Sequence, residues 1–295
     1  MSKIILIVGP TATGKTALSI ALAKEYNAEI INADSTQIYK EPLIATAKIT
    51  ELEKEGIPHH MIDIKSLSEE YSIYDYQKDA RKVLDDLIEK DKNIIIVGGS
   101  GLYVKALLYD YNLEKESSND IDLSNYSNQE LKSMADLIDE NNNIHVNNRH
   151  RLERYIKYNK KTGKIITKTD EINKKLYDFI TIGLNAPREE IYKRCDNRVD
   201  EMFNNGLLDE AKSLYDKHFK NFTTIIGYRE LNEYFNGNIS LDEAKEEMKK
   251  NTRHYAKRQI TFYKHQFDNI VWFNTDYNNF KNTINEVIKY LKEKE

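Results

Sequence analysis

The feature that most constrains this chain is an apolar run followed at once by a loop framed by glycines. Residues 4–8 read Ile-Ile-Leu-Ile-Val, which is typical of a parallel strand buried on both faces. The next eight residues fit the pattern G-x-x-x-x-G-K-S/T and are Gly9, Pro10, Thr11, Ala12, Thr13, Gly14, Lys15 and Thr16. A helical period follows. This order of strand, loop and helix predicts a phosphate-binding loop (P-loop).

Each element of this loop pattern has a chemical reason. The glycines let backbone amides point inward around an anion, and the start of the helix adds its partial positive charge. Lys15 supplies a mobile cation, and the hydroxyl of Thr16 can hold Mg²⁺. The loop alone leaves open whether the ligand is a diphosphate or a triphosphate such as ATP.

Strand and helix signals alternate along much of the chain. Further strand candidates lie at 29–32, 93–97, 179–184 and 269–273. This alternation predicts an α/β fold, with a P-loop NTPase-like parallel sheet flanked by helices. A capping box that begins at Ser240 predicts a long helix near the end of the chain.

A change in composition near residue 111 predicts an inserted domain. From there the sequence is rich in Asn, Ser, Asp and Glu and has few apolar residues. We expect a catalytic core of residues 1–110 and 179–295, and a mainly helical insertion over about 111–178. An end of the insertion near residue 205, after a helix that begins at Pro187, is left open.

Composition excludes several classes of protein. With 40% hydrophobic and 31% charged residues in 295, the chain can bury a core, and disordered or collagen-like classes drop out. No run approaches the roughly 20 apolar residues of a membrane span, and no leader pattern is present, so we expect a cytoplasmic protein without a membrane partner. The single cysteine, Cys195, can form neither an internal disulfide nor a thiolate metal cage.

Two basic segments stand out in a chain whose net charge is −4. Residues 149–168 contain eight basic residues and one acid, and residues 251–267 contain four basic residues and no acid. Such charge often marks only a solvated helix face. On charge alone, a solvated face is the favoured interpretation of both segments.

An acid lies near the predicted loop, although not where a hydrolase would have it. Asp34 follows the second strand and so shares the carboxyl edge of the sheet with the P-loop, where ligands bind in such folds. The residue fits a general base, a magnesium ligand or a helix cap equally well. The third strand ends in Gly98-Gly99-Ser100 instead of an aspartate.

The ordered set of motifs resembles the tRNA dimethylallyltransferase (tRNA isopentenyltransferase) family. Besides the P-loop and Asp34-Ser35-Thr36-Gln37-Ile38-Tyr39, the matching strings are Thr46-Ala47-Lys48, Pro58 to Asp63, Gly98 to Tyr103, Ile226 to Glu230 and Thr252 to Gln259. The resemblance covers about residues 3–109 and 179–265. Where the family pattern reads Gly-Leu-Asp-Ile-Gly, this chain has Glu-Pro-Leu-Ile-Ala at 41–45, which predicts a differently shaped loop.

The resemblance implies a reaction. A dimethylallyl group passes from dimethylallyl diphosphate to the exocyclic amine of the adenosine at tRNA position 37, next to the anticodon, and diphosphate leaves. The P-loop, Lys15 and Thr16 with Mg²⁺ would hold the leaving group, as positive charge there stabilises the breaking C–O bond. Asp34 would be the general base, with Ser100 and Arg198 as the other catalytic residues.

The resemblance also implies which residues bind tRNA. Ser35, Thr36 and Gln37 would hold the flipped adenine with Asp34 and Ser100. Phosphates of the anticodon stem-loop would meet both the insertion and the long helix, at Arg149, Arg151, Arg253, Lys257 and Arg258. We expect a monomer.

Two other functions compete with this interpretation. A P-loop small-molecule kinase would consume ATP with a hydroxylated acceptor and would need no RNA. A non-catalytic RNA-binding protein with a relict P-loop would bind tRNA, and substitution of Asp34 would leave it unaffected.

Overall fold

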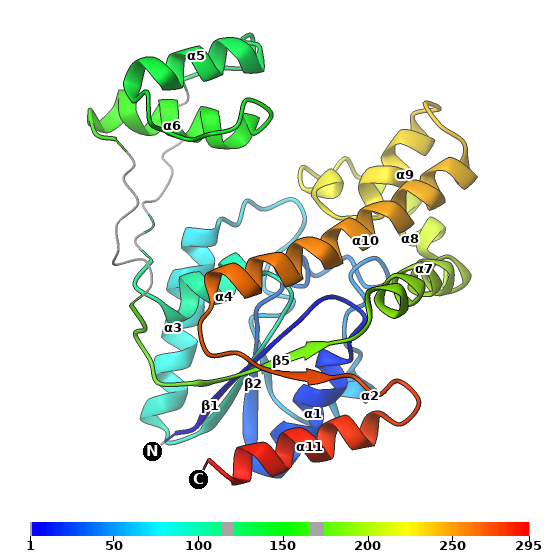
Figure 1. Cartoon of the computed structure of the whole chain (residues 1–295). Coiled ribbons are helices and arrows are strands. Elements are labelled where there is room, and N and C mark those ends of the chain that lie inside the picture. The colour runs from blue at the N-terminus through cyan, green and yellow to red at the C-terminus, as the bar shows by residue number, and fades with distance from the viewer. Residues whose placement is uncertain (1, 112, 114–120, 166–173, 295) are drawn as a thin grey trace. The chain divides into compact units, whose positions relative to one another are not determined.

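The chain is seen in a computed structural model that describes all residues except 1, 112, 114–120, 166–173 and 295 (Figure 1). It divides into two compact units. The larger comprises Met1–Tyr109 and Lys175–Glu295, and the smaller comprises Asp110–Lys174. None of the helices in the described part of the chain combines the length and apolar character that a membrane span requires.

A parallel sheet of six strands forms the centre of the larger unit. Its order is β3-β2-β4-β1-β5-β6, and its strands are β1 (Ile4–Val8), β2 (Ala28–Asn32), β3 (His59–His60), β4 (Asn93–Val97), β5 (Ile180–Asn185) and β6 (Val271–Asn274). β1 lies between β4 and β5, with Leu6 opposite both Ile96 and Thr181. The predicted α/β class is therefore confirmed, and the carboxyl ends of all strands meet at one edge.

Helices cover both faces of this sheet, because successive residues of each strand point to opposite sides. Ile5 and Ile7 of β1 pack with α1 (Lys15–Tyr26) and α11 (Phe280–Lys292). Leu6 and Val8 pack on the other face with α3 (Ile73–Glu89) and α4 (Gly101–Leu108). Burial on both faces explains why the strands are almost wholly apolar.

A second apolar cluster joins the helices that follow β5. These are α7 (Arg188–Asn204), α8 (Leu207–Tyr215), η2 (Phe222–Thr224), α9 (Tyr228–Phe235) and α10 (Leu241–Gln266). The long helix predicted from its capping box is α10, in which Ser240 Oγ accepts a hydrogen bond from the Glu243 amide. The short helix α2 (Glu51–Lys54) precedes β3.

The smaller unit contains α5 (Asn128–Ile138) and α6 (Arg149–Thr162), which pack around Leu131, Leu152 and Ile156. It ends at Lys174. An extension of the insertion to 205 is wrong, because β5 pairs with β1 and β6 and so belongs to the sheet, and α7 follows in the same unit.

We expect Gly98→Ala to destabilise the sheet edge. A Cβ at Gly98 would lie 2.2 Å from the carbonyl carbon and oxygen of Ala33, which cannot move without parting β2 from β4. The free energy of unfolding in urea should fall by about 2–3 kcal/mol. Gly237→Ala, at φ +74° with no atom within 4 Å, is the control and should cost only about 1 kcal/mol of backbone strain. Equal losses would contradict the steric argument.

Candidate functional site

The P-loop connects β1 to α1 and is held in shape from two directions. Within the loop, Thr13 Oγ1 donates a hydrogen bond of 2.8 Å to the Pro10 carbonyl. From behind, Thr275 Oγ1 donates to the Thr13 carbonyl (3.1 Å) and Tyr277 Oη donates to the Ala12 carbonyl (3.2 Å). These bonds fix Ala12 at a φ of +67°, which a residue with a side chain rarely adopts.

Two cations meet at this loop. Lys15 Nζ donates to the Pro10 carbonyl (2.7 Å), and Arg198 Nη1, from α7, donates to Thr11 Oγ1 (3.0 Å). Burial and the nearby Arg198 lower the pKa of Lys15 to about 8, and burial also lowers the pKa of Arg198. Neither cation forms an ion pair with a carboxylate of the described residues. Two neighbouring cations without a counter-ion are suited to bind an anion.

Asp34 lies in the turn after β2, and its two carboxylate oxygens differ. Oδ1 accepts hydrogen bonds from the amide (2.9 Å) and the hydroxyl (2.7 Å) of Thr36. Oδ2 has no hydrogen bond from any described residue. No helix starts at this turn, so Asp34 is not a helix cap. The hydrogen bonds from Thr36 orient the carboxylate, and Oδ2 is left to accept a proton.

Ser100 joins the turn after β4 to the turn that carries Asp34. Its hydroxyl accepts a hydrogen bond from the Ser35 amide (2.9 Å) and donates to Ser35 Oγ (3.0 Å). The next loop anchors the Gln37 side-chain amide, since Gln37 Nε2 donates a hydrogen bond to the Thr46 carbonyl (3.1 Å).

Two residues of α10 that the sequence motifs did not mark as site residues, Tyr255 and Gln259, reach into the site. Gln259 is buried, its Oε1 accepts from the Thr11 amide (2.8 Å), and its Nε2 donates to the Gly99 carbonyl (2.9 Å). A Cβ at Gly99 would lie 2.2 Å from that Nε2, 3.3 Å from Tyr255 Oη and 3.4 Å from Asp34 Oδ2.

These distances explain why residue 99 is a glycine, and they place Gln259 and Tyr255 of α10 beside Asp34. Burial and the charge of Asp34 raise the pKa of Tyr255, which keeps its hydroxyl protonated. The available signal was the motif 252–259 itself, in which Tyr255 and Gln259 share the packing face of the helix.

The cations predicted to bind tRNA fall into two groups. Arg149 is tied to its own unit, donating to the carbonyls of Leu123 (2.8 Å) and Tyr126 (2.7 Å) and pairing with Glu153. Arg151, in contrast, is exposed and has no acidic partner among the described residues.

The same division runs along α10. Its first cations are paired, Lys245 and Lys249 with Asp200, Lys250 with Glu247, and Arg253 with Asp196. Beyond residue 253 the side chains of Lys257, Arg258 and Lys264 are exposed, and no carboxylate of the described residues pairs with them. Positive charge is therefore available only on the second half of the helix.

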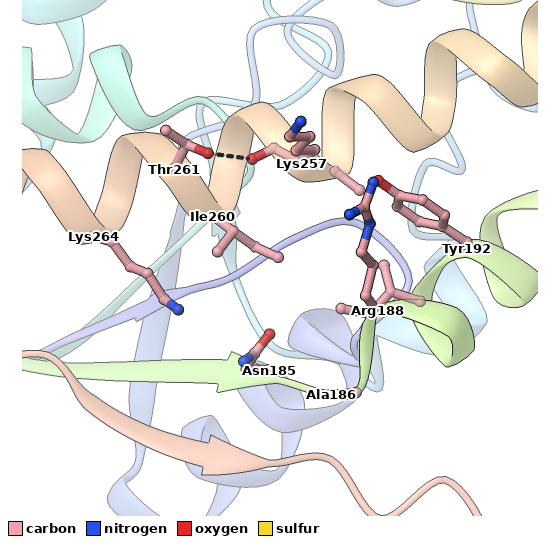
Figure 2. Close-up of a pocket in the computed structure, with 10 residues that line it drawn as sticks. Asn185, Ala186, Arg188, Tyr192, Lys257, Ile260, Thr261 and Lys264 are labelled. Carbon is pink, nitrogen blue, oxygen red and sulfur yellow. Dashed lines mark hydrogen bonds between the residues drawn. The ribbon is translucent and has the colours of Figure 1, made fainter.

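A groove of about 330 Å³ lies between the start of α7 and the second half of α10 (Figure 2). Its floor is apolar, with Ile191, Ala256 and Ile260, and this group also packs against Ala12 of the P-loop. The rim carries three cations, which are Arg188, Lys257 and Lys264. The groove thus combines an apolar floor with a positively charged rim beside the phosphate-binding loop.

The chain is similar to proteins named tRNA dimethylallyltransferase and matches one family model over most of its length. The family model described as IPP transferase matches residues 37–266. A tRNA dimethylallyltransferase of Anoxybacillus flavithermus is 42% identical over 302 residues, which cover 99% of this chain and 97% of the relative. One of Enterococcus faecalis is 42% identical over 310 residues, covering 100% and 99%.

Solved structures agree with these relatives. A tRNA isopentenylpyrophosphate transferase of Staphylococcus epidermidis superposes with a TM-score of 0.75 at 37% identity and full coverage of both chains. A eukaryotic dimethylallyltransferase acting on tRNA gives a TM-score of 0.83 at 28% identity, over 98% of this chain and 78% of that one. With its P-loop, the Asp34 turn and α10 assembled at one sheet edge, the chain belongs to the tRNA dimethylallyltransferase family of enzymes.

Proposed function

We propose that this protein transfers a dimethylallyl group from dimethylallyl diphosphate to the exocyclic amine of the adenosine at tRNA position 37. The observation that carries the proposal is the meeting of Lys15 and Arg198 at the P-loop, beside the turn that carries Asp34. Among the described residues, neither cation has a carboxylate partner and Asp34 Oδ2 has no hydrogen-bond donor. The transfer requires positive charge to stabilise the leaving diphosphate and a base to accept the proton of the amine.

The donor diphosphate would bind in the P-loop. Its backbone amides and the start of α1 favour an anion, and Lys15 exchanges its bond to the Pro10 carbonyl for a phosphate oxygen. Arg198 would stabilise the negative charge that grows as the C–O bond breaks. The groove beside Ala12 suits such a donor, because it has an apolar wall and a cationic rim.

The acceptor adenine would bind on the side of Asp34. The amine nitrogen forms a bond to the first carbon of the allyl group, diphosphate leaves, and the amine proton passes to Asp34 Oδ2. Thr36 holds the other carboxylate oxygen, so the base is oriented before the substrate arrives. Ser35, Gln37 and Ser100 line the approach, and exact placement supplies much of the rate for so weak a nucleophile.

Most ligands of a bound Mg²⁺ would come from the donor diphosphate and from water, and few would come from the protein. The described residues contain no group of three or more His, Cys, Asp or Glu side chains that could hold a metal. Thr16, exposed in the first turn of α1, would supply one hydroxyl, and diphosphate oxygens and water the rest, as Mg²⁺ prefers. Bound Mg²⁺ would neutralise charge on the leaving diphosphate.

The RNA phosphates would meet exposed cations in both units. On α10 these are Lys257, Arg258 and Lys264, and in the smaller unit Arg151 is the exposed candidate. Arg149 and Arg253 would have to give up their present partners, Glu153 and Asp196, to contact RNA. The cytoplasm, where tRNA is found, is the expected place of action, with the protein acting as a monomer.

Family membership leaves the kinase alternative without support. A non-catalytic RNA-binding protein with a relict P-loop would differ from the proposed enzyme only in lacking catalysis.

We expect the purified protein, given unmodified tRNA, labelled dimethylallyl diphosphate and Mg²⁺, to label adenosine. Asp34→Asn keeps the shape but removes the base, so the rate should fall about 10²-fold or more while tRNA affinity holds. If Asp34→Asn labels adenosine as fast as the unaltered protein does, the assignment of Asp34 as the base is wrong. If the unaltered protein labels no adenosine, the proposed reaction is wrong.

The lowered pKa of Lys15 predicts a pH dependence for the donor. Below the pKa of about 8 the ammonium is charged and attracts the diphosphate, and above it the charge is lost. The kcat/KM for the donor should therefore fall as pH rises through about 8, approaching tenfold per pH unit. Lys15→Arg keeps its charge and should shift this fall to higher pH. A flat profile from pH 7 to 9 in the unaltered protein would contradict the role of Lys15.

Unpaired and paired cations of α10 should differ in their effect on RNA binding. Lys257→Ala and Arg258→Ala should each weaken tRNA binding and reduce the slope of log affinity against log salt by about one. Lys250→Ala, which removes an exposed cation already paired with Glu247, is the matched control and should change the slope little. Equal effects of all three would place the RNA elsewhere.

A further inference from the structure

One carboxylate outside the catalytic turns holds a loop that contacts Gln37. Glu210, on α8, accepts hydrogen bonds from three consecutive backbone amides, those of Leu43 (3.0 Å), Ile44 (2.8 Å) and Ala45 (3.1 Å). Its Oε1 also accepts from Tyr228 Oη (2.6 Å). Four donors thus converge on one side chain, and they belong to two distant parts of the sequence.

The loop of residues 41–47 connects the amides that bind Glu210 to the side chain of Gln37. Its backbone is closed on itself, with the Ala47 amide donating to the Ile44 carbonyl (3.0 Å) and Thr46 Oγ1 donating to the Pro42 carbonyl (2.9 Å). The Thr46 carbonyl in turn accepts from Gln37 Nε2 (3.1 Å). A shift of residues 43–45 would therefore move the group that orients Gln37.

Apolar packing alone would not set this orientation. Ile44 and Ala45 pack against the cluster formed by α7 to α10, but such contacts have no direction. The bonds to Glu210 do have direction and involve a charged acceptor, which makes them stronger than neutral ones. Tyr228 is fully buried, and burial with the charge of Glu210 raises its pKa, so its hydroxyl remains a donor.

We propose that Glu210 is a positioning residue for the acceptor adenosine. It fixes the 41–47 loop, the loop fixes the amide of Gln37, and Gln37 holds the adenine. This inference rests on the proposed function, in which Gln37 belongs to the adenine site. It adds a residue that contacts neither substrate, lies on α8 and acts through three backbone amides.

The test is Glu210→Gln, which keeps the size of the side chain but replaces one acceptor oxygen with an N–H group that would face amide donors. We expect kcat/KM for tRNA to fall about tenfold, with the KM for the donor unchanged. Asp209→Asn removes the same charge from an exposed position of α8 and is the matched control, expected to be neutral.

A double-mutant cycle separates positioning from general stability. Gln37→Ala should cost about as much as Glu210→Gln, and the two together should cost no more than Gln37→Ala alone, because both break one chain of contacts. If the fold losses in kcat/KM of the two single variants multiply in the double variant, the proposal is overturned. Absence of prenyl transfer by the unaltered protein would instead refute the proposed function, so the two failures are distinct.

Amide hydrogen exchange gives a readout that needs no activity. In Glu210→Gln the amides of residues 43–45 should exchange at least tenfold faster, while those of β1 and β4 keep their protection. Unchanged protection at 43–45 would overturn the proposal. If Glu210→Gln fails to fold, Tyr228→Phe removes one donor and leaves the carboxylate, and a smaller change of the same kind is expected.

Discussion

The position of β1 in the middle of a parallel sheet is the constraint on which the site depends. Because β1 pairs with β4 on one side and β5 on the other, the turns after these strands open at the same edge. The P-loop, the Ser100 turn and the start of α7 are therefore neighbours, and β2 adds Asp34 from beyond β4.

Helix α10 holds the turns at this edge together. Gln259 links the P-loop to Gly99, and Tyr263 Oη donates to the Gly98 carbonyl (3.2 Å), so one helix holds two of the turns. The ion pair of Arg253 with Asp196 fastens α10 to α7, the helix that carries Arg198. Charges on the first half of α10 thus serve the fold, which leaves those beyond residue 253 for a partner.

Local patterns predicted what depends on neighbours in sequence. The P-loop, the capping box at Ser240 and the apolar strands each rest on a few consecutive residues, and each is present. The extension of the insertion to residue 205 was wrong, because the sequence of α7 carries no sign of the unit in which this helix packs. Whether Arg149 is free or tied to carbonyls was equally hidden, since its partners lie 23 and 26 residues away.

The sequence by itself determined the fold class and the P-loop with Lys15, because each follows from periodicity or from a motif of fixed spacing. Asp34 and Arg198 were given catalytic roles only through the resemblance to a known family. Only the tertiary structure decided how they meet. It showed that Gln259 bridges two turns separated along the chain, that Thr36 holds Asp34 by its Oδ1, and that Glu210 holds a loop 165 to 167 residues away. Contacts between distant segments depend on how whole helices pack, and no local pattern encodes that.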